Sequence, residues 1–183
     1  MKQVIKQQST EKIAEDYISI KLLSSDIIPA KPKLDINGAD LLAILEVEDG
    51  SKFARIQCKG RVLPKPKSSS FVSVEKSYVK GTFTCLLYIK YLADNTEHLF
   101  CFFAHDIKTS NSWLLKEKKY YLNLYGTTFK EKLRLFYFNK DRVRALKEMI
   151  TASDSRKEFH YIFGEGILTL PALKCKGTGG PYY

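Results

Sequence analysis

Three side chains of the sequence, Asp40, Gln57 and Lys59, have the chemistry of a site that holds a metal ion and acts on phosphate. A carboxylate and an amide oxygen, with a neighbouring backbone carbonyl and a second carboxylate, would make the hard-oxygen site that Mg²⁺ or Mn²⁺ prefers. A lysine beside such a site can hold a phosphate or orient an attacking water. These residues can act together only if the strands or helices that carry them lie side by side.

Two runs rich in strand-forming residues, 41–48 and 52–59, flank Asp49-Gly50. Asp-Gly between such runs predicts a β-hairpin, because its two-residue turn needs positive φ and glycine adopts this without steric cost. In that register Asp40 is opposite Lys59, and Leu42 is opposite Gln57. Directly opposed Cβ atoms lie about 4.5–5.5 Å apart and diagonal ones about 7–8 Å, so the three polar side chains could reach one small volume.

Side chains alternate along a strand, and this divides the hairpin into two faces. The face predicted to lie in the core is wholly apolar and consists of Leu41, Ala43, Leu45, Val47, Ala54, Ile56 and Cys58. The opposite face carries the polar residues. An ordinary cross-strand ion pair between Asp40 and Lys59 is the alternative explanation of that face, since such pairs are common.

A helix is predicted from Ser9 or Thr10, either of which can cap it, to about Leu23, because apolar residues recur there at helical spacing. Glu15 lies on a mixed stripe of this helix, between turns that carry apolar residues. Its carboxylate could lie at the edge of a packed surface, or it could be an ordinary solvated glutamate. Residues 24–39 contain prolines, Asn and Gly and are predicted to form a loop.

This order of residues resembles the PD-(D/E)xK superfamily of restriction-endonuclease-like nucleases over about residues 10–105. The segments that carry the resemblance are Ala14-Glu15, Gly38-Ala39-Asp40-Leu41-Leu42 and Arg55-Ile56-Gln57-Cys58-Lys59. The resemblance implies that Asp40 is the principal metal ligand, Gln57 the second ligand and Glu15 the helix carboxylate. It also implies that Lys59 is the catalytic lysine and that the backbone carbonyl of Cys58 is a further ligand.

Two positions depart from the pattern of that superfamily. Gln57 stands where most members have Glu or Asp, although a Gln-x-Lys form is similar to that of Mrr-type restriction enzymes. A neutral amide supplies an oxygen but no charge, so metal binding would depend more on Asp40 and Glu15. Ala39 stands where the name of the superfamily has proline.

The chain has 30 Lys and Arg against 20 Asp and Glu, a net charge of +10, and the excess lies after residue 59. Such a surface attracts phosphate backbones through counterion release, although it also serves solubility. Arg61, Lys65 and Lys67 follow the proposed site on a loop with prolines and serines, and are the predicted DNA contacts. The alternative is a flexible, solvated connection.

Other chemistry has little basis in the sequence. The four cysteines are far apart without a Cys-x-x-Cys pair, and the three histidines form no pair at ligand spacing. No Gly-x-Ser-x-Gly turn or Gly-x-Gly-x-x-Gly motif is present. No run approaches eighteen apolar residues and no apolar signal segment follows Met1, so we expect a cytoplasmic protein.

The expected fold is α/β (α+β), with a restriction-endonuclease-like central mixed β-sheet flanked by helices, in a domain over 1–158 with a partly flexible extension over 159–183. Further strands are predicted at 71–75, 82–91, 98–104, 120–125 and 133–138, and a helix capped by Asn139 to about Ile150. Phe100, Phe102 and Phe103 are expected in the sheet core rather than on a base-stacking platform.

The expected function is that of a metal-dependent endodeoxyribonuclease that uses Mg²⁺ or Mn²⁺ on double-stranded DNA. Whether it acts as a homodimer is left open. One alternative is a non-catalytic nucleic-acid-binding module that keeps the nuclease fold. The neutral side chain of Gln57 favours this alternative. A second is a structural or complex-assembly protein in which Asp40 and Lys59 simply pair.

Overall fold

The computed structural model describes residues 2–33, 37–48, 50–64, 68–125 and 129–154. The predicted extension over 159–183 lies outside these residues. In chain order, the elements are α1 (Lys2–Leu23), β1 (Ile28–Ala30), β2 (Leu41–Val47), β3 (Gly50–Leu63), β4 (Ser70–Glu75), the 3₁₀ helix η1 (Lys76–Tyr78), β5 (Thr84–Tyr91), β6 (Glu97–Phe103), α2 (Ala104–Thr109), β7 (Trp113–Lys116), β8 (Lys119–Leu124), α3 (Phe129–Lys132), the 3₁₀ helix η2 (Arg134–Phe136) and α4 (Lys140–Thr151).

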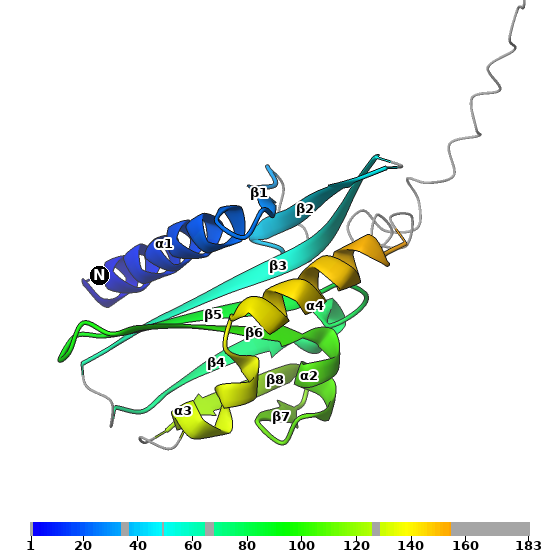
Figure 1. Ribbon diagram of the computed structural model, residues 1–183. Helices are drawn as coiled ribbons and strands as arrows, with labels where there is room; N and C mark the ends of the chain where they lie inside the picture. The colour runs from blue at the N-terminus through cyan, green and yellow to red at the C-terminus, as the bar shows by residue number, and fades with distance from the viewer. Residues whose placement is uncertain (1, 34–36, 49, 65–67, 126–128, 155–183) are drawn as a thin grey trace, which may run out of the picture.

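Two sheets form the fold (Figure 1). The main sheet has the order β1-β2-β3-β5-β6, with β3 and β5 parallel and the other neighbours antiparallel, and the second sheet has the order β4-β8-β7. Parallel strands cannot be joined by a tight turn, and the connection from β3 to β5 runs through β4 and η1. The prediction of an α+β fold with a central mixed sheet flanked by helices is confirmed.

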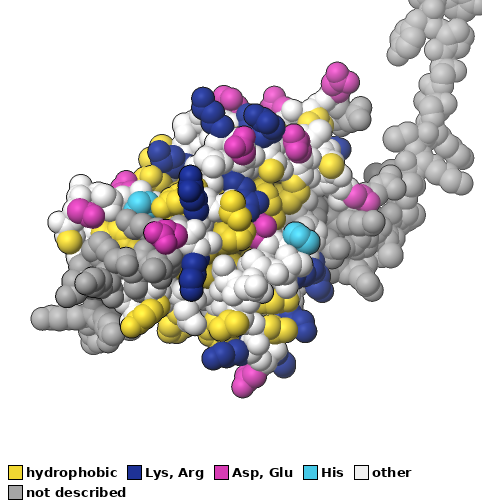
Figure 2. Space-filling model, turned by 60° about the horizontal axis from the view of Figure 1, so that its bottom comes forward, with side chains coloured by type: hydrophobic (Ala, Val, Ile, Leu, Met, Phe, Trp, Pro, Cys, Tyr) yellow, Lys and Arg dark blue, Asp and Glu magenta, His cyan; other side chains and the backbone are white. Residues whose placement is uncertain are grey.

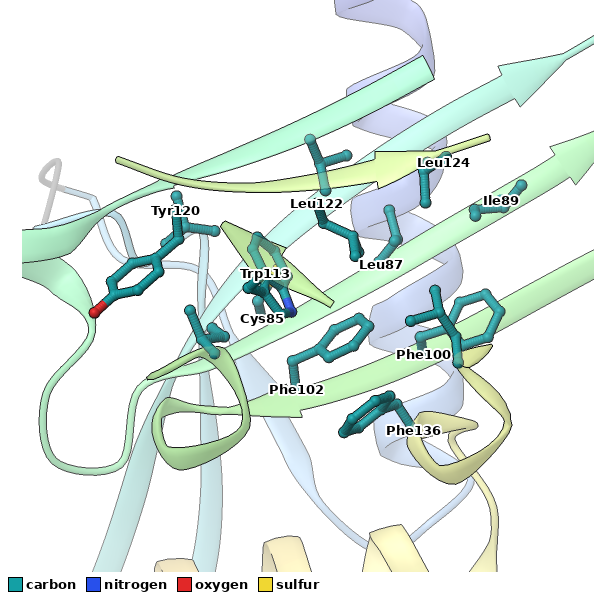
Figure 3. Packing of buried hydrophobic residues seen from close by; sticks show 14 of the residues in the cluster. Cys85, Leu87, Ile89, Phe100, Phe102, Trp113, Tyr120, Leu122, Leu124 and Phe136 are labelled. Carbon is teal, nitrogen blue, oxygen red and sulfur yellow. The ribbon is translucent and has the colours of Figure 1, made fainter. Parts of the chain in front are cut away.

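Each face of the main sheet is buried in its own core. On one face, α1 and α4 pack on the sheet through Ile18, Leu22 and Leu146. The other face packs against the second sheet (Figure 3), where the rings of Phe102 and Trp113 lie edge to face with centroids 5.3 Å apart. A strand buried on both faces needs apolar residues throughout, which explains the nearly unbroken apolar run of β5.

The predicted strands at 71–75, 82–91, 98–104 and 120–125 are present as β4, β5, β6 and β8. Phe100 and Phe102 are fully buried, as expected of core residues. Asn139 caps α4, since its side-chain oxygen accepts a hydrogen bond from the backbone N–H of Arg142 at 3.0 Å.

Other predicted elements are wrong. α1 begins at Lys2, so Ser9 and Thr10 lie inside the helix and do not cap it; no glycine or proline precedes them to stop it. Residues 133–138 contain η2 instead of a strand. Leu133 and Phe136, three residues apart, are both buried, which is the spacing of a 3₁₀ turn rather than of a strand. The strands β1 and β7 and the helices α2 and α3 were not predicted.

The hairpin forms, but in a different register from the predicted one. Leu42 pairs with Arg55 instead of Gln57, and Gly50 pairs with Val47, so Gly50 is a strand residue and not a turn residue. Asp49 lies outside the described residues. Moving the turn by one residue moves each partner by two, which leaves every side chain on its predicted face. The apolar face is accordingly in the core, but the prediction that Asp40 lies directly opposite Lys59 is wrong.

Candidate functional site

Asp40 lies where the pairing of β2 with β3 ends. Its backbone N–H donates to the carbonyl of Ile56 at 2.9 Å, and its Oδ2 accepts a hydrogen bond from the backbone N–H of Cys58 at 2.6 Å. Leu41 is the first residue of β2 and pairs with Ile56, whereas β3 continues beside β5 to Leu63. The carboxylate of Asp40 thus accepts a backbone hydrogen bond from β3 at the point where pairing with β2 has ended.

Two of the predicted site residues, Glu15 and Lys59, act on Asp40 through their charges despite the changed register. Burial raises the pKa of the Asp40 carboxyl, and the negative charges of Glu15 and Glu11 raise it further. The hydrogen bond from Cys58 and the positive charge of Lys59 act in the opposite direction. Charges from α1 and from β3 therefore act on one partly buried carboxylate.

Glu15 is held by a residue that the sequence analysis missed. Its Oε2 lies 2.5 Å from Nζ of Lys31, which belongs to the loop after β1. The Glu15 side chain is 23% exposed, so it lies at the edge of a packed surface, as one of the two alternatives proposed. Glu15 also raises the pKa of Lys31, and Asp40 does so to a smaller extent. No local pattern in the sequence specifies an ion pair between a helix and a loop.

Gln57 lies between Ile56 and Cys58, the two residues whose backbone groups bind Asp40. Its side chain is only 8% exposed, and within the described part of the chain its Oε1 has no hydrogen-bond partner. A buried amide oxygen without a partner costs about 1–3 kcal/mol and calls for a water or an ion. This unpaired oxygen has the chemistry of a ligand for a hard cation.

Lys59 lies two residues further along β3, on the same side of the strand as Gln57. It is half-buried, and among the described residues no ion pair joins it to Asp40 or to another carboxylate. The interpretation of Asp40 and Lys59 as a simple ion pair therefore has no support. The ammonium group of Lys59 acts on Asp40 through its charge while its donors stay available.

Arg61, one of the predicted DNA contacts, binds backbone carbonyls of the protein itself. The guanidinium of Arg61 donates from Nε and Nη2 to the carbonyl of Phe71, at 3.0 and 2.8 Å, and from Nη1 to the carbonyl of Gly60 at 2.6 Å. Arg61 thereby links β3 to β4, and burial lowers its pKa. Lys65 and Lys67 lie outside the described residues.

The oxygens of the predicted ligands fit a hard divalent cation by their chemistry. Asp40 and Glu15 supply carboxylates, Gln57 supplies the unpaired amide oxygen, and the backbone carbonyl of Cys58 remains a further candidate. Cys58 would contribute only that carbonyl, because burial raises the pKa of its thiol well above the ordinary range. Within the described ranges, no group of three or more His, Cys, Asp or Glu residues could hold a metal ion, so such a site would depend on Gln57.

No protein-family model, no curated protein and no solved structure matches this chain. Among the described residues, no helix is both long enough and apolar enough to cross a membrane.

Proposed function

We propose that the protein is a metal-dependent endonuclease that hydrolyses phosphodiester bonds of double-stranded DNA. The observation that carries the proposal is that the charges of Glu15 and Lys59 act on the partly buried carboxylate of Asp40 at the end of the β2–β3 pairing, and that Gln57, in the segment of β3 whose backbone binds Asp40, has an unpaired amide oxygen. The order of elements supports it as well. A helix with a glutamate, an aspartate at a strand start and a strand with Gln-x-Lys follow one another as in the PD-(D/E)xK nucleases that the sequence resembles.

In this proposal Asp40, Gln57 and Glu15 hold Mg²⁺ or Mn²⁺. A bound cation of this kind polarises a phosphate and lowers the pKa of a coordinated water. Asp40 must be ionised to serve as a ligand, and Glu15 must leave Lys31 or be shared with it. Lys59 stabilises the additional negative charge that develops on the phosphate in the transition state.

The net charge of the chain supports nucleic acid as the substrate. The charge is +10, and all of the excess lies after residue 59, outside the segments that supply the proposed ligands. A positive surface attracts a phosphate backbone by releasing its counterions.

A second candidate is a nucleic-acid-binding module that keeps this arrangement without catalysis. Two observations favour it: the ammonium of Lys31 neutralises Glu15, and Gln57 carries no charge. Asp40 is then the unneutralised carboxylate among the predicted ligands, and one carboxylate holds a divalent cation weakly.

Nicking of supercoiled plasmid DNA in Mg²⁺ tests the proposal. We expect Asp40→Asn and Lys59→Met each to lower the rate by about 100-fold or more, in the range seen when a charge-stabilising group is removed. Asparagine keeps an oxygen that can accept the hydrogen bond from Cys58, so this change spares the backbone contact. Asp16→Asn and Lys12→Met, at exposed positions of α1, are the matched controls and should leave the rate unchanged.

Undiminished cleavage by both site variants would refute the endonuclease. Salt-sensitive DNA binding without metal, unchanged in Asp40→Asn and accompanied by no cleavage in Mg²⁺ or Mn²⁺, would establish the non-catalytic module instead.

A further inference from the structure

A pocket whose described lining residues include none of the predicted site residues lies beside η1. It is a pocket of about 440 Å³ between η1, α2 and the turn that joins β7 to β8. Glu75, Val79 and Tyr120 line it together with four lysines. The volume is within the range of sites that bind small molecules or parts of larger ligands.

Four lysines from separate segments meet at this pocket. Lys76 belongs to η1, Lys80 to the connection into β5, Lys108 to α2 and Lys118 to the turn before β8. Within the part of the chain that the structure describes, none of the four forms an ion pair. Among the described residues of the lining, Glu75 is the only one with a carboxylate, and its Oε1 lies 2.8 Å from Nζ of Lys119, which is outside the lining.

This arrangement favours a ligand with several negative charges. Four unneutralised ammonium groups around one hollow repel each other, and a phosphate-bearing chain relieves that repulsion and releases its own counterions. The floor of the pocket is apolar, since Val79 and Tyr120 are buried. Figure 2, in which the molecule is turned so that the bottom of Figure 1 comes forward, shows Lys and Arg side chains among hydrophobic and acidic ones on that face.

The segment that lines the pocket also contacts β3 and the loop that precedes Asp40. Arg55 of β3 is buried and donates from Nη1 to the carbonyl of Tyr78 at 3.4 Å and from Nη2 to the carbonyl of Lys80 at 2.5 Å. On the other side, the ring of Tyr78 lies so close to Gly38 that a Cβ there would be 2.2 Å from Cδ2 of the ring. Tyr78 thus links the pocket to the loop that ends in Asp40.

We infer that this pocket binds backbone phosphates of the nucleic acid on which the Asp40 site acts, which rests on the proposed function. The lysines hold phosphates that flank the one to be cleaved, and they do so without reading the base sequence. The buried contacts of Arg55 and Tyr78 fix the distance between the pocket and the Asp40 site.

The test is fluorescence anisotropy of a labelled DNA duplex with the full chain in EDTA, so that no cleavage takes place. The double variant Lys76→Gln/Lys108→Gln should bind at least 10-fold more weakly. The slope of log affinity against log salt should become shallower by about 2, since each phosphate contact contributes about 0.9. The control Lys12→Gln/Lys132→Gln removes the same charge from exposed positions outside the pocket, and should change affinity by less than about 3-fold.

An equal loss of DNA affinity in both double variants would overturn the inference, because the net charge of the protein would then explain the binding. So would unchanged DNA binding in the pocket variant, because the lysines of the pocket would then not hold phosphates of the DNA. A wild-type protein that does not bind DNA would overturn both proposals. Binding that depends on the pocket, without cleavage in Mg²⁺, would refute the endonuclease alone.

Discussion

The carboxylate of Asp40 accepts a hydrogen bond from the backbone N–H of Cys58, with 2.6 Å between Oδ2 and N. The bond fixes Asp40 to β3 at the point where β2 ends. The position of the carboxylate is therefore set by the backbone of β3 and does not depend on a partner side chain opposite it. This explains why Asp40 stays beside β3, where the charges of Lys59 and Glu15 act on it, although the hairpin register differs from the predicted one.

Burial of Asp40 predicts a specific pH dependence of stability. Because the pKa of its carboxyl is raised in the folded state, that state binds the proton more tightly than the unfolded chain does. Its contribution to stability is present at low pH and is lost as the pH rises through the folded-state pKa. The free energy of unfolding of Asp40→Asn, relative to wild type, should therefore increase from pH 3 to pH 7.

Urea denaturation at a series of pH values measures this difference, with Asp16→Asn as the control for removing one negative charge. A difference between Asp40→Asn and wild type that stays constant with pH, or decreases as the pH rises, would contradict the buried position of the carboxyl. The same titration predicts that cleavage, which needs ionised Asp40, falls on acidification.

The ion pair of Glu15 with Lys31 predicts that Lys31 weakens metal binding. Lys31→Gln removes the ammonium that competes for the Glu15 carboxylate and a positive charge that acts on Asp40. We expect Mn²⁺ affinity to rise by about 3- to 10-fold in calorimetry. Stability should change by less than about 1 kcal/mol, because Lys31 is largely exposed.

Lys33→Gln, two residues away and exposed, is the control and should leave the affinity for Mn²⁺ as it is. Equal effects of the two variants would mean that Glu15 is not a ligand. No Mn²⁺ signal from any form of the protein would favour the non-catalytic module.

The parts of this fold that could be predicted from the sequence are those set by local patterns. Alternation fixed which residues of β2 and β3 face the core, and the N-cap of α4 followed from Asn139 alone. Such local patterns do not determine the register of the hairpin. Asp-Gly permits several turns, and pairing with β1 and β5 on the two sides contributes to the choice among them.

The contacts that complete the candidate site come from the tertiary structure and have no local signal. Lys31 reaches Glu15 because β1 brings its loop beside α1, and a short β1 with Pro29 has no alternating pattern to predict it. The lysines of the pocket are dispersed along the chain from residue 76 to residue 118, and only the second sheet and α2 bring them together.

Arg55 predicts a large effect on stability, since it is a charged side chain with only 1% exposure. Arg55→Met removes the donors to the carbonyls of Tyr78 and Lys80 and the contact of the guanidinium with the ring of Phe83. We expect the free energy of unfolding in urea to fall by about 2–4 kcal/mol, because carbonyls inside the protein lose charged donors.

Arg144→Met is the matched control. Its side chain is 71% exposed and its contact with Asp141 is long, at 3.9 Å, so the expected change is within about 0.5 kcal/mol. If Arg55→Met and Arg144→Met have the same free energy of unfolding, Arg55 does not hold η1 in place. The link from the pocket to the Asp40 site would then be lost.

Gly60 is the residue that allows α1 to lie directly on β3. A Cβ at this position would lie 2.7 Å from Cβ of Ala14 and 2.8 Å from the backbone oxygen of Thr10, and neither atom can move unless the helix moves. Gly60→Ala should cost about 1–3 kcal/mol in the free energy of unfolding, as expected when a packed interface is overfilled. Since Glu15 follows Ala14, displacement of α1 also moves the proposed helix ligand, and Mn²⁺ affinity should decrease.

The second variant for this prediction is Ala14→Gly, which removes one of the two clashes. The double variant Gly60→Ala/Ala14→Gly should lose less free energy of unfolding than the sum of the losses in the two single variants, although the contact with Thr10 remains. Additive single changes, or a Gly60→Ala protein with wild-type stability and Mn²⁺ affinity, would mean that the approach of α1 to β3 is not what positions Glu15. In that case the helix carboxylate would have to be omitted from the proposed site.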